Sequence, residues 1–538
     1  MSGTFAITIS GYISIATSQG DATPSRSIPD SRFPIPDCMH LPLNRTSGVP
    51  IFRQIYDGLR RAILDGRLRP GQRIPSTRSL AADLGVSRLP VLTAYEQLLH
   101  EGYLVGRTGS GTFVTRDIPD HLLRSRAIGR LTPQSRPGAG TRAAPNQPSP
   151  ASWSFPVVPF QIGLPALDLF PHAAWAKLVA REVRAETPER LAYGDPAGLR
   201  SLRGAIAEHL RTSRAVRCVA DQILIVPGSQ AALRLAAATL LERNDRVALE
   251  EPGYFGAHRA FRAAAAQLVP VPVDADGLNV TALQRRGANI RAVYVTPSHQ
   301  YPLGMTMSAS RRFALLDWAA RHQAWILEDD YDSEFRYISR PVGSLQGMDA
   351  RDRVIYMGTF SKALFPAVRV GYVVVPPPLW TRFLESRFAF DIFAPTLYQR
   401  SLAEFLKTGH FARHLRRMRS AYLERRDALL RGLERHCGDL VEVHNSDAGL
   451  HVTVLLREGL DDQEVAARLG RRGLAAIPLS NSYVGPVRKQ GLLLGFGCAA
   501  PQRLHAATRI LSDVLRERRD EAGHQHEERW ATARPNAD

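Results

Sequence analysis

The stretch GTFSKALFPAVRVGY, residues 358–372, contains one of only four lysines among the 69 basic residues of this chain. The sequence uses arginine almost everywhere else but has a lysine at position 362. A guanidinium stays protonated and cannot condense with an aldehyde, whereas a lysine amine loses its proton readily and forms a Schiff base. Lys362 is therefore a candidate to hold an aldehyde covalently.

The neighbours of Lys362 could hold the rest of such a molecule. Thr359 and Ser361 offer hydroxyls and Arg369 offers a guanidinium, and these groups bind phosphate. The acidic stretch DDYDSEF begins at Asp329, whose carboxylate could keep a pyridine nitrogen protonated and make the ring an electron sink. Alone, this stretch would also fit a metal site or a solvated edge. Together with the lysine, these groups predict bound pyridoxal 5′-phosphate.

A second candidate anion site lies at PGSQAALRL, residues 227–235. Gly228 and Ser229 follow a strand-like run and open a helix, so free backbone N–H groups and the helix dipole would point at a bound anion. Glycine and serine are favoured at any strand-to-helix turn, so this signal is weak by itself. The interpretation of this turn as a phosphate site therefore depends on the lysine and the acidic stretch.

Short β-branched runs alternate with helical stretches from residue 190 onward, which indicates a mostly parallel sheet with helices on both faces. In such sheets the chemistry lies at the carboxyl ends of the strands, where the candidate residues fall. The expected strands are residues 222–226, 246–250, 291–295, 324–328, 353–357 and 369–375.

A smaller block precedes this one and reads as a winged helix-turn-helix. Residues 51–65 repeat apolar side chains four apart, as a helix with one buried face does, and Gly66 ends the helix. Ser76 and Ser87 can cap two short helices joined by a Gly-containing turn, and YLVGRTGSGTFV, residues 103–114, predicts a hairpin wing. We expect Val91, Tyr95, Leu98 and Leu99 to form the buried face of the second short helix.

The exposed edges of this block favour DNA as its partner over a mere packing role. Residues 40–115 hold ten arginines against five acidic residues. Arginines fall at the starts of both short helices and in the wing, the edges that approach a duplex when a recognition helix enters the major groove. Hydroxyls at the same edges can donate to phosphates. The candidate DNA-binding residues are Ser76, Thr77, Arg78, Ser87, Arg88, Arg107 and Thr108.

The composition agrees with a nucleic-acid partner but does not establish one. The chain has 538 residues, a net charge of +18 and an isoelectric point near 10.2, which arginine drift in a GC-rich genome could also produce. Four scattered cysteines without CxxC spacing argue for a reducing cytoplasm and against a disulfide framework or a zinc site. There is no apolar run long enough for a membrane span.

Composition breaks suggest the domain limits. Residues 1–45 read as a disordered N-terminal extension, 46–115 as the winged helix-turn-helix, 116–156 as a flexible linker, 157–518 as the large domain and 519–538 as a charged disordered tail. Regular patterning begins only after Met39, so translation could start there. The intact mass of the native protein tests that hypothesis.

The smaller block resembles the winged helix-turn-helix of the GntR family of bacterial regulators. The motifs PSTRSLAADLGVSR, AYEQLLHEGYL and GSGTFV occur in the family's order and spacing. The family usually has a small polar residue and Thr after VSR, where this chain has Leu89 and Pro90. Pro90 cannot donate an N–H to a Ser87 cap, and a hydroxyl that could touch DNA is missing.

The larger block resembles fold type I aminotransferases through YGDPAGLRSLRGAIAEHL, PGSQAAL, EEPGY, TPSHQYPLG, EDDYDSEFRY and GTFSKALFPAVRVGY. The resemblance implies an α/β fold with a smaller C-terminal α+β subdomain, a homodimer, Lys362 as the Schiff-base lysine and Asp329 as the pyridinium partner. It places Tyr331 at the ring hydroxyl, Tyr254 on the ring and His299 near it. The implied phosphate ligands are Gly228, Ser229, Gln230, Thr359, Ser361 and Arg369, with Tyr193 reaching the partner's phosphate.

The two blocks together resemble the MocR subfamily of GntR regulators. This implies a pyridoxal phosphate-dependent regulator that binds operator DNA and senses an amino compound or a B6 vitamer. Many aminotransferases bind the substrate α-carboxylate with an arginine near the C-terminus, but the matching strand here is GLLLGFG. Arg488 lies just outside this strand and could substitute for that arginine. The alternatives are a working aminotransferase with an accessory DNA-binding domain and a degenerate domain kept for dimerisation.

Overall fold

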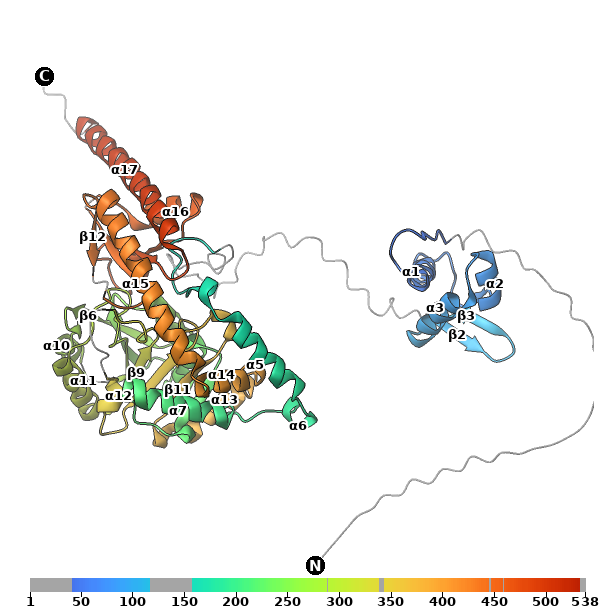
Figure 1. The fold of residues 1–538 in the computed structure, drawn as a ribbon, viewed down its shortest axis with the longest axis horizontal. Coiled ribbons are helices and arrows are strands. Elements are labelled where there is room, and N and C mark those ends of the chain that lie inside the picture. Colours follow the sequence, from blue (N-terminus) through green and yellow to red (C-terminus); the bar gives the residue numbers. More distant parts are fainter. Residues whose placement is uncertain are drawn as a thin grey trace, which may run out of the picture. The chain divides into compact units, whose positions relative to one another are not determined.

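The computed structural model describes residues 41–116, 157–287, 289–337, 343–444, 447–457 and 459–532. They fall into two compact units, 41–116 and 157–532 (Figure 1). Met39, most of the expected N-terminal extension and almost all of the expected linker lie outside the described residues. No helix in the described ranges is long and apolar enough to cross a membrane.

The first unit consists of three helices and a small sheet. The helices are α1 (Ile51–Leu64), α2 (Thr77–Asp83) and α3 (Arg88–His100). The sheet has the order β1-β3-β2, with β2 (Leu104–Arg107) and β3 (Gly111–Val114) forming the expected wing and β1 (Arg73–Ile74) pairing with β3. Two residues are too short for a periodic signal, so β1 was not predicted.

The core of the first unit follows the predicted helical faces with one exception. Ile55 and Leu59 of α1 pack with Val91 and other buried residues of α3. Leu99 was expected on the buried face but is exposed, because the neighbouring Leu98 occupies the position that points into the core.

The two predicted caps of the first unit differ. The Ser76 hydroxyl accepts a hydrogen bond from the Ser79 N–H at 3.1 Å and caps α2. Ser87 is the residue before α3, but its side chain makes no capping hydrogen bond. Proline occupies the third position of that helix and has no N–H to donate.

The second unit is built on an eight-stranded sheet with the order β4-β11-β10-β9-β8-β5-β6-β7. The five strands from β10 to β6 are parallel, whereas β11 pairs antiparallel with both of its neighbours. All six expected strands are present within two residues at each end. The strands are β4 (Ile223–Val226), β5 (Arg246–Glu251), β6 (Gln267–Asp274), β7 (Gly277–Leu278), β8 (Ile290–Val295), β9 (Trp325–Asp330), β10 (Val354–Thr359) and β11 (Gly371–Val374).

Helices cover both faces of this sheet, as the strand–helix alternation predicted (Figure 1). On β5, Val247 and Leu249 pack in the cluster that includes α8 (Ser229–Leu240) and α9 (Phe255–Ala263). Ala248 packs on the other side, with α10 (Val280–Arg285) and α11 (Ala309–Arg321). Because successive side chains of a strand alternate between faces, one strand contributes to two cores.

The C-terminal part forms a smaller antiparallel sheet with the order β12-β13-β15-β14. Its helices are α15 (His410–Cys437), α16 (Asp462–Arg471) and α17 (Pro501–Thr532). Its strands are β12 (Val441–His444), β13 (His451–Leu456), β14 (Ile477–Pro478) and β15 (Gly491–Gly495).

The start of the expected disordered tail, residue 519, falls inside helix α17, so this boundary was wrong (Figure 1). Ion pairs hold the helix against α16 where it passes this point, from Arg468 to Glu521 at 2.7 Å and from Arg518 to Glu464. Composition alone does not reveal these pairs, because each charge finds its partner on another helix.

Candidate functional site

Lys362 lies three residues after the end of β10, at the carboxyl edge of the sheet. Its Nζ donates a hydrogen bond to the carbonyl oxygen of Gly163 at 2.9 Å. Burial lowers the pKa of Lys362, while the carboxylates of Asp332 and Asp329 favour the protonated form. A lowered lysine pKa increases the fraction of neutral amine, which is the form that attacks an aldehyde.

Asp329 lies near the end of β9, beside Met357 of β10. Its Oδ2 accepts a hydrogen bond from the Tyr294 hydroxyl at 2.8 Å. Its Oδ1 is buried and, among the described residues, has no hydrogen-bond partner. Burial raises the pKa of Asp329 to about 7. A buried acceptor without a donor is the arrangement that a protonated pyridine nitrogen would complete, so Asp329 fits the predicted role.

A buried ion pair supports Asp329 from the next position of the strand. The Asp330 carboxylate lies 2.8 Å from the Arg214 guanidinium and accepts a second hydrogen bond from Tyr356 at 2.5 Å. Arg214 also donates to the Ser298 hydroxyl at 2.5 Å. This network was not predicted, because Arg214 ends a helix 116 positions before its partner Asp330.

His299 sits within a cluster of polar and aromatic side chains beside the lysine. Its Nδ1 lies 3.1 Å from the Asp332 carboxylate and 3.0 Å from the Tyr331 hydroxyl. The ring of His451 lies 5.4 Å from the His299 ring, and its Nε2 donates to the Pro302 carbonyl. Burial lowers the pKa of His451 to about 3, so the ring is neutral. His451 was not predicted, because it stands in an ordinary strand of the C-terminal sheet.

Tyr254 precedes α9 and is partly buried in the same region. Its hydroxyl accepts a hydrogen bond from the side-chain amide of Gln230 at 3.1 Å, and its ring lies 5.3 Å from that of Tyr301. These contacts join the start of α8 to the aromatic cluster, so two of the predicted cofactor residues are held together.

The predicted phosphate ligands gather around the start of α8. Gly228 has φ +91°, and a Cβ there would lie 3.3 Å from the Arg369 guanidinium, which donates to the Pro227 carbonyl. The Thr359 hydroxyl accepts from the Ser361 N–H at 3.2 Å. The exposed Arg369 and the free N–H groups of the twelve-residue helix present positive charge to a phosphate.

Two predicted positions stand apart from this cluster. The Tyr193 side chain is 83% exposed and contacts the ring of Phe393, 6.1 Å away. Arg488 is exposed, and it lies near the carboxylate of Glu251, whose pKa is raised by burial although the charge of Arg488 opposes that rise. The structure therefore gives no support to Arg488 as a replacement for the carboxylate-binding arginine.

The candidate DNA contacts of the first unit lie at its surface. Ser76, Arg78, Ser87, Arg88, Arg107 and Thr108 are exposed, and Thr77 is half-buried. The Arg88 Nε donates to the Thr77 hydroxyl at 3.1 Å, which joins the starts of α2 and α3. The Arg107 guanidinium lies over the Phe113 ring at 4.9 Å. Positive charge is thus held at the predicted edges, available to phosphates.

Comparison with known proteins places both units in families. Residues 52–114 match the family of bacterial regulatory proteins, gntR family, and residues 156–492 match aminotransferase class I and II. The chain is 40% identical to the probable rhizopine catabolism regulatory protein MocR of Rhizobium meliloti, over 88% of this chain and 96% of that protein. The chain belongs to the MocR subfamily of GntR-family regulators.

Other comparisons agree with this placement. The HTH-type pyridoxine biosynthesis transcriptional regulator PdxR of Corynebacterium glutamicum is 34% identical over 88% of this chain and 98% of its own length. Among solved structures, the multiple substrate aminotransferase of Thermococcus profundus matches with a TM-score of 0.62 and 29% identity, over 68% of this chain and 92% of that chain. The predicted fold class, a winged helix-turn-helix plus a fold type I aminotransferase-like domain, is confirmed.

Proposed function

We propose that this MocR-subfamily regulator binds operator DNA through its winged helix and pyridoxal 5′-phosphate through Lys362. Asp329 would hold the pyridine nitrogen, Tyr331 the ring hydroxyl and Tyr254 the ring face. The residues around the start of α8, with Arg369, would hold the phosphate. When bound, the cofactor supplies an aldehyde that captures primary amines and a ring that accepts electrons. A small amino compound or a B6 vitamer would be the effector.

The observation that carries the proposal is the buried Oδ1 of Asp329, which lacks a partner among the described residues. Burial of this carboxylate is unfavourable, and a cationic ring nitrogen would both neutralise it and supply the missing donor. Lys362 lies close enough for its charge to affect Asp329. A carboxylate and a lysine at one sheet edge match the two ends of a pyridoxal ring.

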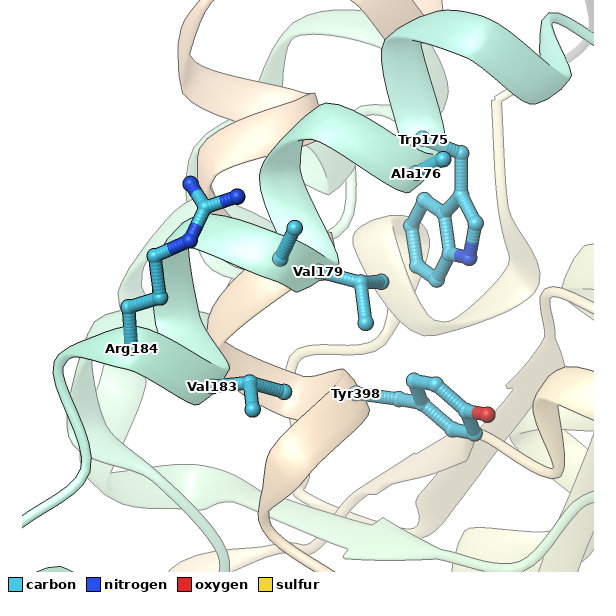
Figure 2. A pocket seen from close by; sticks show the side chains of 7 residues that line it. Trp175, Ala176, Val179, Val183, Arg184 and Tyr398 are labelled. Carbon is cyan, nitrogen blue, oxygen red and sulfur yellow. The ribbon is translucent and has the colours of Figure 1, made fainter.

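We further propose a homodimer, in which a second copy covers exposed apolar side chains of the large unit. Leu191 is 74% exposed and Phe388 is 62% exposed, which is costly for large apolar side chains. An apolar groove of about 480 Å³ runs between α5 (His172–Arg184) and α14 (Leu397–Lys407), lined by Trp175 and Tyr398 among others (Figure 2). The exposed Tyr193 would then contact the partner's phosphate group.

Effector binding would act by favouring one of two conformations that differ in DNA affinity. A coupling of about 1–3 kcal/mol is typical of such linkage, which corresponds to roughly 5–150-fold in affinity. We place the protein in the bacterial cytoplasm, bound to DNA in the nucleoid.

A mobility shift on DNA from the region upstream of its own gene tests the proposal. The protein is stripped of cofactor, and binding is measured without additions, with pyridoxal phosphate, and with pyridoxal phosphate plus candidate amines. We expect DNA affinity to change when cofactor or amine is added. A DNA affinity that stays the same with pyridoxal phosphate and with the amines would contradict a sensing role.

The second candidate function is a working aminotransferase with an accessory DNA-binding unit. It is favoured by the similarity of the large unit to solved aminotransferases, including the kynurenine aminotransferase of Pyrococcus horikoshii at 27% identity and a TM-score of 0.63. Steady-state turnover of amino donors separates the two functions. Turnover at enzyme rates, about 1–10³ per second, together with no affinity for the upstream DNA, would favour the enzyme.

A further inference from the structure

The strand that carries a carboxylate-binding arginine in many aminotransferases has three buried leucines here, Leu492, Leu493 and Leu494. On β15, Leu492 and Leu494 pack into the core that includes α15 and α17. Leu493 points to the opposite face and is completely buried in a separate cluster with Tyr301 and Leu479. The alternation of the strand therefore assigns Leu493, and not its neighbours, to the face that looks toward the large sheet.

This apolar cluster reaches the lysine. Ile162, which precedes the glycine that accepts the Lys362 hydrogen bond, packs against the cluster, and so do Tyr254 and Tyr331. At the end of the same strand, a Cβ on Gly495 would lie 2.2 Å from the carbonyl oxygen of Gln161. The leucine-bearing face and the segment beside Lys362 are thus in direct contact.

The charges around the lysine are acidic. The charged groups that act on the Lys362 pKa are Asp332 and Asp329, and those that act on His451 are His299 and Lys362. In the part of the chain that the structure describes, no guanidinium is among the groups that shift either pKa. A carboxylate bound here would lie near the like charge of Asp332 and would have the buried apolar cluster of Leu493 in place of a guanidinium, which is unfavourable for an anion.

Buried or partly buried arginines on this side are engaged in holding the backbone: Arg312 donates to the carbonyl oxygens of Met307 and Pro297, and two more are engaged as well. Arg214 pairs with Asp330. Arg336 donates to the Ser298 carbonyl at 2.8 Å and to the Thr306 hydroxyl at 3.1 Å. Both guanidiniums stabilise the loop after β8, and their use for an effector carboxylate would break these hydrogen bonds.

We infer that the effector of this site is a primary amine without an α-carboxylate, because the strand position of the carboxylate-binding arginine is filled by Leu493, which is buried against Tyr301 and Leu479. The inference rests on the proposed function and narrows it. It separates simple amines, including the amine form of the B6 vitamers, from α-amino acids. The amine of the effector would lie toward Lys362, where the nearby carboxylate of Asp332 favours a protonated amine.

Matched pairs of compounds test this inference on the full-length protein with its cofactor. Phenethylamine is compared with phenylalanine, 3-methylbutylamine with leucine, and ethanolamine with serine, because each pair differs only by the carboxylate. Two properties are titrated: the absorbance of the protein-bound cofactor and the affinity for upstream DNA. We expect each amine to act at a concentration at least ten-fold lower than that of its amino acid.

Substitutions at Leu493 test whether this side chain causes the preference for amines over amino acids. Leu493→Arg should make the amino acid of each pair act at a lower concentration than the amine. Leu493→Met keeps the cluster apolar and should leave the preference for the amine unchanged. Equal responses within the wild-type pairs, or a stronger response to the amino acids, would overturn the inference even if the arginine variant did not fold. If the purified protein took up no pyridoxal phosphate at all, the proposed function would fail as well, so the two failures are distinguishable.

Discussion

Replacing Asp329 by asparagine should stabilise the cofactor-free protein and weaken cofactor binding at the same time. The carboxyl is buried, and its pKa is raised from 3.8 to about 7. That difference corresponds to about 4 kcal/mol of unfavourable burial of the charged form. Asparagine carries no charge and can still accept the Tyr294 hydrogen bond. About 4 kcal/mol is an upper limit, because the new amide N–H takes the position where Oδ1 has no described partner.

The pH dependence follows from the raised pKa. Between about pH 4 and pH 7 the unfolded carboxyl has lost its proton while the folded one keeps it, so the wild-type protein loses stability as pH rises. Above about pH 7 both are ionised and the loss is complete. The advantage of Asp329→Asn should therefore be about 2 kcal/mol larger at pH 8 than at pH 5.5.

Urea unfolding of the cofactor-free protein at these two pH values measures the effect, with cofactor affinity determined separately by absorbance titration. Asp317→Asn is the matched control, because its carboxylate is exposed and forms a surface ion pair with Arg321. We expect the control to change stability by less than about 1 kcal/mol at either pH. A difference between variant and wild type that is the same at both pH values would refute the reasoning, as would an unstable variant with unchanged cofactor affinity.

Three further predictions address the other contacts. Lys362→Ala should abolish the visible absorbance of bound pyridoxal phosphate while the winged helix still binds DNA in a mobility shift; surviving absorbance would show that another group holds the aldehyde. The affinity for DNA should fall steeply as the salt concentration rises. Arg88→Ala should weaken DNA binding and reduce the slope of log K, the DNA association constant, against log salt concentration by about one. The same variant should leave the cofactor absorbance unchanged. Arg53→Ala, which removes an exposed arginine paired with Asp57, is its control, and a flat salt profile would contradict phosphate contacts. Arg214→Met should lower the free energy of unfolding of the large unit by about 3–5 kcal/mol in urea, because it leaves the Asp330 carboxylate buried without its ion-pair partner. Adding Asp330→Leu to the same protein should restore much of the lost stability. A loss of stability below about 1 kcal/mol on Arg214→Met would show that the ion pair is not buried as described.

The strands that carry the site were predictable because each is a continuous apolar run between clear turn signals. Strand β6 was not predicted, since Pro270 and Pro272 interrupt its pattern and proline cannot donate to a sheet ladder. The structure accommodates both prolines because β7 pairs only with Val273 and Asp274, beyond them.

The candidate site was predictable only as far as local motifs reach. Asp329 and Lys362 stand at strand ends, where function is expected in this kind of sheet. The Arg214–Asp330 pair and the neutral His451 depend on segments that meet only in the folded chain, and neither Arg214 nor His451 lies in a recognisable local pattern. The direction of Leu493 likewise required the register of the C-terminal sheet, since the three neighbouring leucines are identical in type.

The hydrogen bond between Lys362 and Gly163 gives the lysine two competing uses. Gly163 belongs to the first described segment after the stretch that leads from the DNA-reading unit, and the neighbouring Phe160 bridges to Gly495 of the C-terminal sheet. A nitrogen committed to an aldehyde no longer carries the ammonium protons that this backbone oxygen accepts. The hydrogen bond to Gly163 and a covalent bond to an aldehyde are therefore alternative uses of the same nitrogen.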